Sequence, residues 1–280
     1  MRCCTFFQPP LLVLYVDTMK RVWQTHRREE KFMKLLPWNP FPLEIEAYTV
    51  TKYFGDMSFN NPDSHTVLNN RIQLSKYLHT TIEKMVAPRQ THTNHLQKVS
   101  KADGGTNMRK IENKLENTDA LYTSDSDLFL VTFHADCTPI LLYCRDTGIV
   151  SSIHSGWLGT TRQITTTVLK HLIEVENCNP KEIYAYIGPS IEKHNYEVQQ
   201  DVISQIQKMD FDTSKYYEQR DATHFLLDNK GLNKQQLLNV GIPRENITVS
   251  TKCTIDNNDL LFSHRKKEAG RNITIIRKKR

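Results

Sequence analysis

Three short apolar runs near the middle of the chain constrain the fold more than any other feature. They span residues 128–133, 140–143 and 149–153, and the turn residues Asp146-Thr147-Gly148 separate the last two. Short apolar runs bounded by turn residues are typical of strands that are buried on both faces. A connection this short joins only antiparallel neighbours. The centre of the chain is therefore predicted to be an antiparallel hairpin inside a sheet.

Other segments add both strands and helices to this hairpin. Apolar runs at 183–187, 247–250 and 273–276 predict further strands. Apolar residues at helical spacing between 67 and 78, and again between 164 and 173, predict two helices. This mixture predicts an α+β fold, with mixed β-sheets flanked by helices in a single domain. A doubly wound parallel fold is the alternative, and the tight hairpin turn argues against it.

The two ends of the chain differ from its centre. Residues 1–40 are predicted to be an N-terminal extension without a role in the fold, and residues 41–280 to be the domain, with a basic C-terminal tail. The apolar run 11–16 is too short to span a membrane and lacks the layout of a signal peptide. No membrane partner is therefore expected. Six cysteines without any C-x-x-C indicate reduced thiols in the cytoplasm.

The net charge of +6 is modest, and part of it lies in the C-terminal tail. No stretch interleaves basic and aromatic residues as a nucleic-acid surface requires, so no nucleic-acid partner is expected. A small positive surplus remains compatible with anionic small-molecule substrates.

Three polar residues stand at strand ends and could share a metal ion. His92 lies in the connecting segment 86–99, which is predicted to be extended, while Cys137 and His154 flank the central hairpin. Two imidazoles and a thiolate suit zinc, and three protein ligands leave a fourth position open, as in catalytic sites. The separations of 45 and 17 residues do not fit a zinc finger. From residue types alone, Cys137 is equally interpretable as a small core residue.

Two further histidines compete as ligands. His134 lies three residues before Cys137, so an extended backbone would direct the two side chains to opposite faces. His95 stands in the same relation to His92. Both are predicted to lie outside the ligand set.

Several motifs in order resemble the YfiH-like family, whose members are also called laccase-domain or polyphenol oxidase proteins and purine nucleoside phosphorylases. The resemblance spans roughly residues 45–278. The motifs are QTH at 90–92, DALYT at 119–123, ADCTPIL at 135–141, IHSGWLG at 153–159, IGPSIEKHNYEV at 187–198 and FSHR at 262–265. In that family the QxH, ADC and HxGW motifs carry the zinc ligands, which implies His92, Cys137 and His154 here.

The resemblance implies a zinc-dependent purine nucleoside phosphorylase that also deaminates adenosine. Its substrates would be phosphate and the purine nucleosides adenosine, inosine and S-methyl-5'-thioadenosine. Asp136 is then a catalytic candidate, which could orient a ligand or move a proton. The FSHR motif supplies three candidate substrate contacts, Ser263, His264 and Arg265. Leu158 stands where the family has an arginine, which puts phosphate binding in question.

Two alternative functions remain open at this stage. A His₂Cys set can also hold copper, which would fit a copper-dependent polyphenol oxidase. A multicopper centre, however, uses many histidines in H-x-H pairs, and the chain has eleven histidines and no such pair. The second alternative is a non-catalytic partner protein, since Leu158 and Ser190 both depart from the family pattern.

Overall fold

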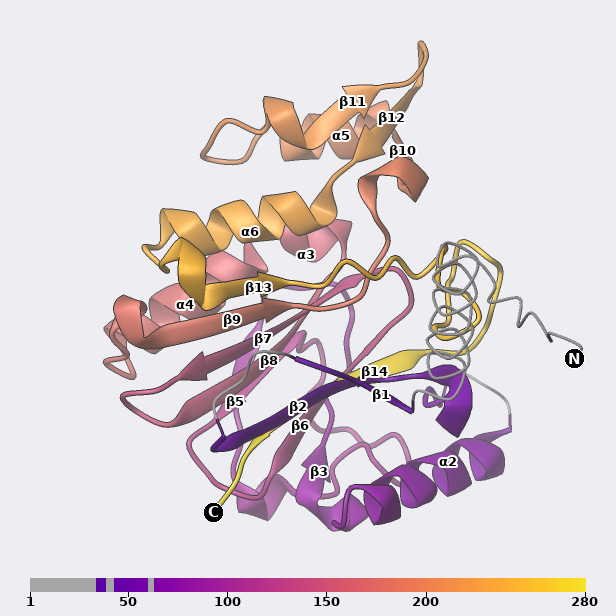
Figure 1. The fold of residues 1–280 in the computed structure, drawn as a ribbon, viewed down its shortest axis with the longest axis vertical. Coiled ribbons are helices and arrows are strands. Elements are labelled where there is room, and N and C mark those ends of the chain that lie inside the picture. The colour runs from indigo at the N-terminus through magenta and orange to yellow at the C-terminus, as the bar shows by residue number, and fades with distance from the viewer. Residues whose placement is uncertain (1–33, 39–42, 60–62) are drawn as a thin grey trace, which may run out of the picture. The chain divides into compact units, whose positions relative to one another are not determined.

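The computed structural model describes residues 34–38, 43–59 and 63–280 of the chain (Figure 1). Its strands form three sheets. The five-stranded sheet has the order β1 (Leu35–Pro37), β2 (Ile45–Val50), β14 (Asn272–Lys278), β6 (Phe129–His134) and β3 (Met85–Val86). The six-stranded sheet has the order β13 (Ile247–Val249), β9 (Ile183–Ile187), β7 (Thr138–Cys144), β8 (Ile149–Ser155), β5 (Ala120–Thr123) and β4 (Leu96–Lys98). The small third sheet has the order β10 (Glu197–Gln199), β12 (His224–Leu227) and β11 (Tyr217–Gln219).

Five α-helices accompany the sheets in the described part of the chain. They are α2 (Ser64–Tyr77), α3 (Trp157–Thr161), α4 (Ile164–Glu174), α5 (Gln200–Ile206) and α6 (Asn229–Asn239). The predicted hairpin is confirmed as β7 and β8, which pair antiparallel. Strand β7 is also antiparallel to its other neighbour, β9, whereas β13 and β9 are parallel. Mixed pairing of this kind confirms the α+β class and excludes the doubly wound alternative.

Strand β7 shows why the central runs are apolar throughout. Its alternate residues Ile140, Leu142 and Cys144 join a core cluster with α4 and α6. The residues between them, Leu141 and Tyr143, join a second cluster with strands of the five-stranded sheet. Successive side chains of a strand point to opposite faces. Both faces of β7 are therefore buried, so its sequence does not alternate between apolar and polar residues.

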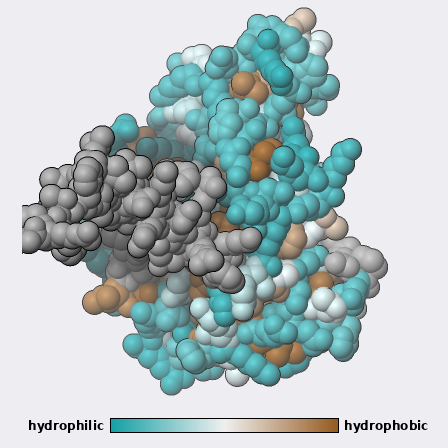
Figure 2. All heavy atoms as spheres, turned by 45° about the vertical axis from the view of Figure 1, so that its right-hand side comes forward, coloured by the Kyte–Doolittle hydropathy of each residue, from teal (hydrophilic) through white to brown (hydrophobic). Residues whose placement is uncertain are grey.

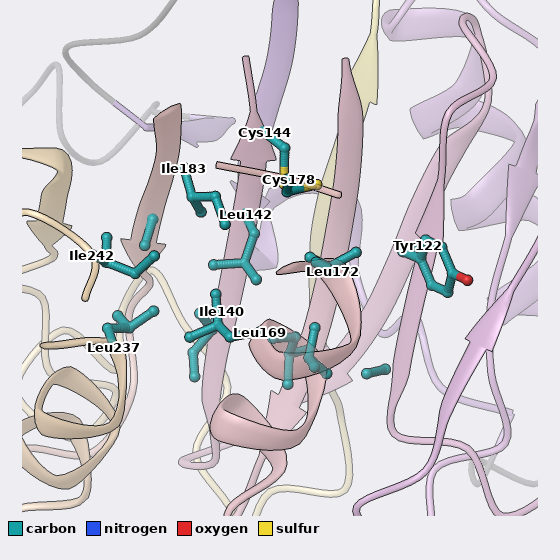
Figure 3. Close-up of a cluster of buried hydrophobic side chains, with 14 of the residues drawn as sticks. Tyr122, Ile140, Leu142, Cys144, Leu169, Leu172, Cys178, Ile183, Leu237 and Ile242 are labelled. Carbon is teal, nitrogen blue, oxygen red and sulfur yellow. The ribbon is translucent and has the colours of Figure 1, made fainter. Parts of the chain in front are cut away.

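Helices close the outer faces of the two large sheets. On the six-stranded sheet, Leu169 and Leu172 of α4 and Leu237 of α6 pack against strand residues (Figure 3). On the five-stranded sheet, Leu74 of α2 packs with Ile273 of β14. The two sheets share a core between them and carry helices outside, which is a stable way to bury every apolar face.

Two segments depart from the expectation. Segment 86–99 is not one extended strand, because β3 and β4 flank an irregular stretch that carries His92. Within the range expected to be an extension, Leu35 pairs with Val50, and Trp38 is buried and stacks on Tyr186 at 5.5 Å. Residues 35–38 thus belong to the folded domain. The rest of the predicted extension lies outside the described residues apart from Lys34.

The described surface is mainly hydrophilic on the face seen in Figure 2, where apolar atoms form small separate spots. Among the described residues, no helix has the length and apolar character needed to cross a bilayer.

Candidate metal centre

The three predicted ligands come together from three separate parts of the fold. Cys137 lies in the turn between β6 and β7, and His154 lies near the end of β8. The register of the hairpin pairs Pro139 with His154, which brings Cys137 beside that histidine. His92 reaches the same point from the irregular stretch after β3. The ligand atoms of all three residues lie within 4.8 Å of one another.

The spacing of these atoms suits a small divalent cation. Cys137 Sγ lies 3.9 Å from His92 Nε2, and the ring centroids of His92 and His154 are 4.9 Å apart. Bonds to zinc of about 2.0–2.3 Å in a tetrahedron require donor atoms roughly 3.3–3.8 Å apart. A contraction of less than an ångström at the Cys137–His92 pair would reach that spacing. The donor set therefore fits a zinc-type ion.

Asp119 holds the site together, although its sequence context gave it no separate role. It is fully buried, and its Oδ1 lies 2.8 Å from His154 Nδ1. The same carboxylate accepts hydrogen bonds from the backbone N–H groups of Thr91, His92 and Thr93. The bond to Nδ1 leaves Nε2 of His154 as the ligand atom, an arrangement common for metal-binding histidines. The signal in the sequence was an acidic residue directly before the buried strand of the DALYT motif.

The electrostatics of the site favour the ionised form of Cys137, which is the form that binds a cation. Burial opposes ionisation of the Cys137 thiol, but the charge of His154 and hydrogen bonds from both histidines prevail and lower its pKa to about 6. Burial also opposes charging of His154, but the Cys137 thiolate and Asp119 prevail and raise its pKa to about 9. Without metal, the two shifts together favour a thiolate beside an imidazolium. A bound cation would replace the imidazolium proton.

The backbone around the ligands leaves little freedom. His92 has a φ of 62°, in the left-handed region that non-glycine residues seldom adopt. This conformation lets three consecutive N–H groups point at one carboxylate, as described for Asp119. Gly156 follows β8 directly, and a Cβ there would lie 2.8 Å from His92 Cδ2 and 3.0 Å from Cys137 Sγ. Only glycine fits at this position without displacing a ligand.

We expect Gly156→Ala to weaken metal binding about 10- to 100-fold, the range seen when ligand orientation is disturbed. The added methyl group meets two ligand side chains that Asp119 and the turn hold in place. Gly159→Ala, three residues later in helix α3, is the matched control, because its Cβ would have ordinary contacts of 3.5 Å or more. Zinc affinity is measured by competition with a chromophoric chelator. Equal affinities of the two variants would contradict the close packing at Gly156.

A cavity of about 470 Å³ opens at the ligands, within the size range of small-molecule sites. Its wall includes all three ligands, His134 and three arginines. The lining residues used below are Arg71, Arg89, Arg271, His134 and His264. The site thus combines a candidate cation position with several basic groups that line one cavity.

Of the three predicted substrate contacts, the structure brings only His264 to this cavity. Ser263 is fully buried, and its backbone N–H donates to Glu268. Arg265 instead donates from Nη2 to the carbonyl of Glu197 at 2.7 Å, in an exposed position. Leu158 also lies outside the cavity lining. The arginine that faces the cavity from this region is Arg271.

Asp136 is placed for positioning rather than for contact with a substrate. It is buried, has a φ of 80°, and is not among the residues that line the cavity. Its Oδ1 accepts from Thr254 Oγ1 at 2.5 Å, and its Oδ2 accepts from the N–H of Arg265 at 2.8 Å. The carboxylate therefore ties the turn that carries Cys137 to two distant loops.

Arg71 and His134 are cavity residues that the sequence did not indicate. Arg71 is 2% exposed and donates to the backbone carbonyls of Met57, Asn107 and Met108.

His134 is buried, with Nε2 2.6 Å from Thr274 Oγ1. Burial and nearby positive charges lower the pKa of His134 to about 3, so it is neutral. Its Nδ1 has no hydrogen-bond partner among the described residues. His95, the other competing histidine, lies outside this cavity lining.

Comparisons with known proteins agree with the fold. Residues 54–279 match the family model described as "Multi-copper polyphenol oxidoreductase laccase". The chain is 34% identical over 212 residues to the protein named purine nucleoside phosphorylase YlmD of Bacillus subtilis (strain 168), which covers 75% of this chain and 76% of that protein. It is 31% identical over 232 residues to a protein of the same name from Staphylococcus aureus, covering 82% and 84%.

Solved structures show the same architecture. YlmD from Geobacillus stearothermophilus aligns with a TM-score of 0.83 at 29% identity, covering 87% of this chain and 94% of that one. The Bacillus licheniformis hypothetical protein YfiH aligns with a TM-score of 0.82 at 30% identity, covering 86% and 100%.

Proposed function

Because the chain belongs to the family described as multi-copper polyphenol oxidoreductase laccase, whose relatives above are named purine nucleoside phosphorylases, we propose that it is a zinc-dependent purine nucleoside phosphorylase. Its proposed substrates are adenosine, inosine and S-methyl-5'-thioadenosine, and it would also deaminate adenosine. The observation that carries the proposal is the convergence of two imidazoles and a thiolate at the wall of a cavity lined by three arginines.

His92, Cys137 and His154 would hold the zinc ion, which when bound supplies a Lewis acid beside the substrate. Asp119 keeps His154 in the tautomer that presents Nε2 to the cavity. The ligand set requires Cys137 as a thiolate, and its lowered pKa favours that form. We place the activity in the cytoplasm, where thiols remain reduced.

The arginines of the cavity support an anionic co-substrate. Guanidinium groups bind phosphate oxygens through paired N–H donors. Arg89 also pairs with Glu116, and Arg271 also donates from Nη1 to the backbone carbonyls of residues 268–270. These contacts hold both side chains in place, and each guanidinium has further donors to offer. We therefore assign phosphate to this basic part of the cavity.

His134 and His264 are the proposed contacts of the nucleoside. The neutral imidazole of His134, which is buried in the cavity wall, can exchange hydrogen bonds with a base or a ribose hydroxyl without the cost of burying a charge. The unpartnered Nδ1 of His134 supports this role. These contacts do not require a carboxylate of the protein. This agrees with Asp136, whose carboxylate already accepts hydrogen bonds from Thr254 and Arg265.

Product identification tests the proposal. We expect the zinc-loaded protein to release hypoxanthine from inosine only when phosphate is present, with ribose 1-phosphate as the second product. Adenosine should yield adenine and, independently of phosphate, inosine with ammonia. Chelation should abolish all of these reactions, and added zinc should restore them. Absence of every product with zinc-loaded protein would favour a non-catalytic role.

Copper-dependent oxidation of phenols is the second candidate, because the family description names a laccase and a His₂Cys set can bind copper. Metal analysis of protein purified without added copper separates the two. Stoichiometric copper together with sustained phenol turnover would favour the oxidase over the phosphorylase.

A further inference from the structure

A second group of metal-type ligands lies outside the candidate metal centre. His194 belongs to the 3-10 helix η5 (Lys193–Asn195), and Cys253 and Asp256 belong to the loop after β13. Each residue offers one ligand atom, and these atoms lie within 4.8 Å of one another. His194 Nε2 is 2.7 Å from Asp256 Oδ2. A borderline-soft thiol, an imidazole and a carboxylate are all accepted zinc ligands.

The sulfur of this group is surrounded like that of a metal-bound thiolate. Cys253 is 2% exposed, yet its Sγ accepts hydrogen bonds from the backbone N–H of Glu192 and from Asn195 Nδ2, both at 3.4 Å. N–H donors directed at a ligand sulfur are a common part of metal sites. Asn195 Nδ2 also donates to Asp256 Oδ1 at 2.7 Å. Partners that orient ligands in this way are typical of metal sites.

The backbone holds the two segments at a fixed distance. Ser190 and Cys253 form a parallel bridge, and the N–H of Thr254 donates to the carbonyl of Ser190 at 3.1 Å. The N–H of Asn257 donates to the carbonyl of Cys253 at 2.9 Å. The side chains of the remaining ligands, His194 and Asp256, are 62% and 49% exposed. A cation can therefore enter from solvent, and water can complete its coordination.

We propose that His194, Cys253 and Asp256 form a second binding site for a divalent transition metal of the zinc type. The site shares no ligand with His92, Cys137 and His154. Thr254, next to Cys253, donates to Asp136, the residue before Cys137. A metal held at the second site would thus fix the loop that positions the turn of the candidate metal centre. The site requires no particular reaction at the cavity, so it stands independently of the proposed function.

Metal titration of the full chain tests this site. Metal-free wild type is compared with His194→Ala and with Asp256→Asn, and Zn²⁺ is titrated against a chromophoric chelator. We expect each variant to bind about one equivalent less than the wild type. In a His92→Ala/His154→Ala background, Co²⁺ should still give a thiolate-to-cobalt charge-transfer band, and the further change Cys253→Ser should remove it.

His224→Ala is the matched control, because His224 pairs with Asp221 at 2.9 Å on the surface as His194 pairs with Asp256. Its zinc stoichiometry should equal that of the wild type. Both exposed-ligand variants are expected to fold, since they alter partly solvated side chains. Unchanged stoichiometry in both His194→Ala and Asp256→Asn, or a cobalt band that survives Cys253→Ser, would overturn the proposal.

Discussion

Replacing Cys137 by serine is expected to empty the candidate metal centre and to lower nucleoside phosphorolysis by more than about 100-fold. Mutation of a residue that hydrogen-bonds to a metal ligand already lowers metal affinity or activity about 10- to 100-fold, and loss of the ligand itself lowers them further. Serine has nearly the volume of cysteine, but its hydroxyl does not ionise at neutral pH as this thiol does. Cys137 lies in a turn between two strands, so the sheets that surround it should fold unchanged.

Metal content, circular dichroism and product release are measured on the same preparations. Cys178→Ala is the control, because that thiol is buried in the core cluster that includes α4 residues and does not line the cavity. The control should keep its metal and its activity. A Cys137→Ser protein with full zinc content and full turnover would refute the assignment of the centre.

Asp119→Asn is expected to destabilise the protein by about 3–5 kcal/mol, the usual result of breaking a buried charge pair from one side. The amide of asparagine has only one acceptor oxygen, whereas both oxygens of Asp119 accept hydrogen bonds. If its oxygen accepts from His154, its NH₂ group meets the backbone N–H donors of Thr91 and Thr93. We also expect zinc affinity to fall about 10- to 100-fold, because His154 loses the partner that orients it.

The pH dependence of stability gives a second readout for Asp119. Burial by itself would raise its pKa, but hydrogen bonding and charge from His154 and the bonds from Thr93 lower it from 3.8 to about 2. A depressed pKa contributes stability above the unfolded value and loses it as pH falls from about 4 toward 2. In metal-free protein, wild type should therefore lose more unfolding free energy over this range than Asp119→Asn.

Denaturant unfolding between pH 7 and pH 2 measures both effects. Asp212→Asn is the control, since Asp212 is exposed and accepts a backbone hydrogen bond from Ser214. It should stay within about 0.5 kcal/mol of the wild type at neutral pH. Equal stability of Asp119→Asn and wild type at pH 7 would show that the buried carboxylate is not the support that its contacts indicate.

Most of the secondary structure could be predicted because it follows from local patterns. The turn Asp146-Thr147-Gly148 between two apolar runs specifies β7 and β8, and the spacing from 164 to 173 specifies α4. Segment 86–99 could not be predicted in the same way. Its irregular backbone is imposed by hydrogen bonds to Asp119, which lies 27 residues after His92. Periodicity carries no information on such a partner.

The same difference between local patterns and long-range contacts applies to the candidate site. His92, Cys137 and His154 were identified from residue type and family motifs, and they do converge. Ser263 and Arg265 were expected at the substrate because of their motif, but they lie outside the cavity lining while Arg271 lines it. A motif fixes which residues are neighbours along the chain. It does not fix which of their side chains face the cavity.

The amino-acid sequence by itself determined the hairpin, the α+β class and the choice of three candidate ligands, because these depend on local spacing, on donor chemistry and on family motifs. Tertiary structure alone decided that Asp119 supports the ligands, that Arg71 and His134 face the cavity, and that His194 meets Cys253. Each of these contacts joins segments that are far apart along the chain. Their meeting depends on the pairing of strands from distant segments, as between β5 and β8, and on how the sheets pack, and the free energy of both is a property of the whole domain.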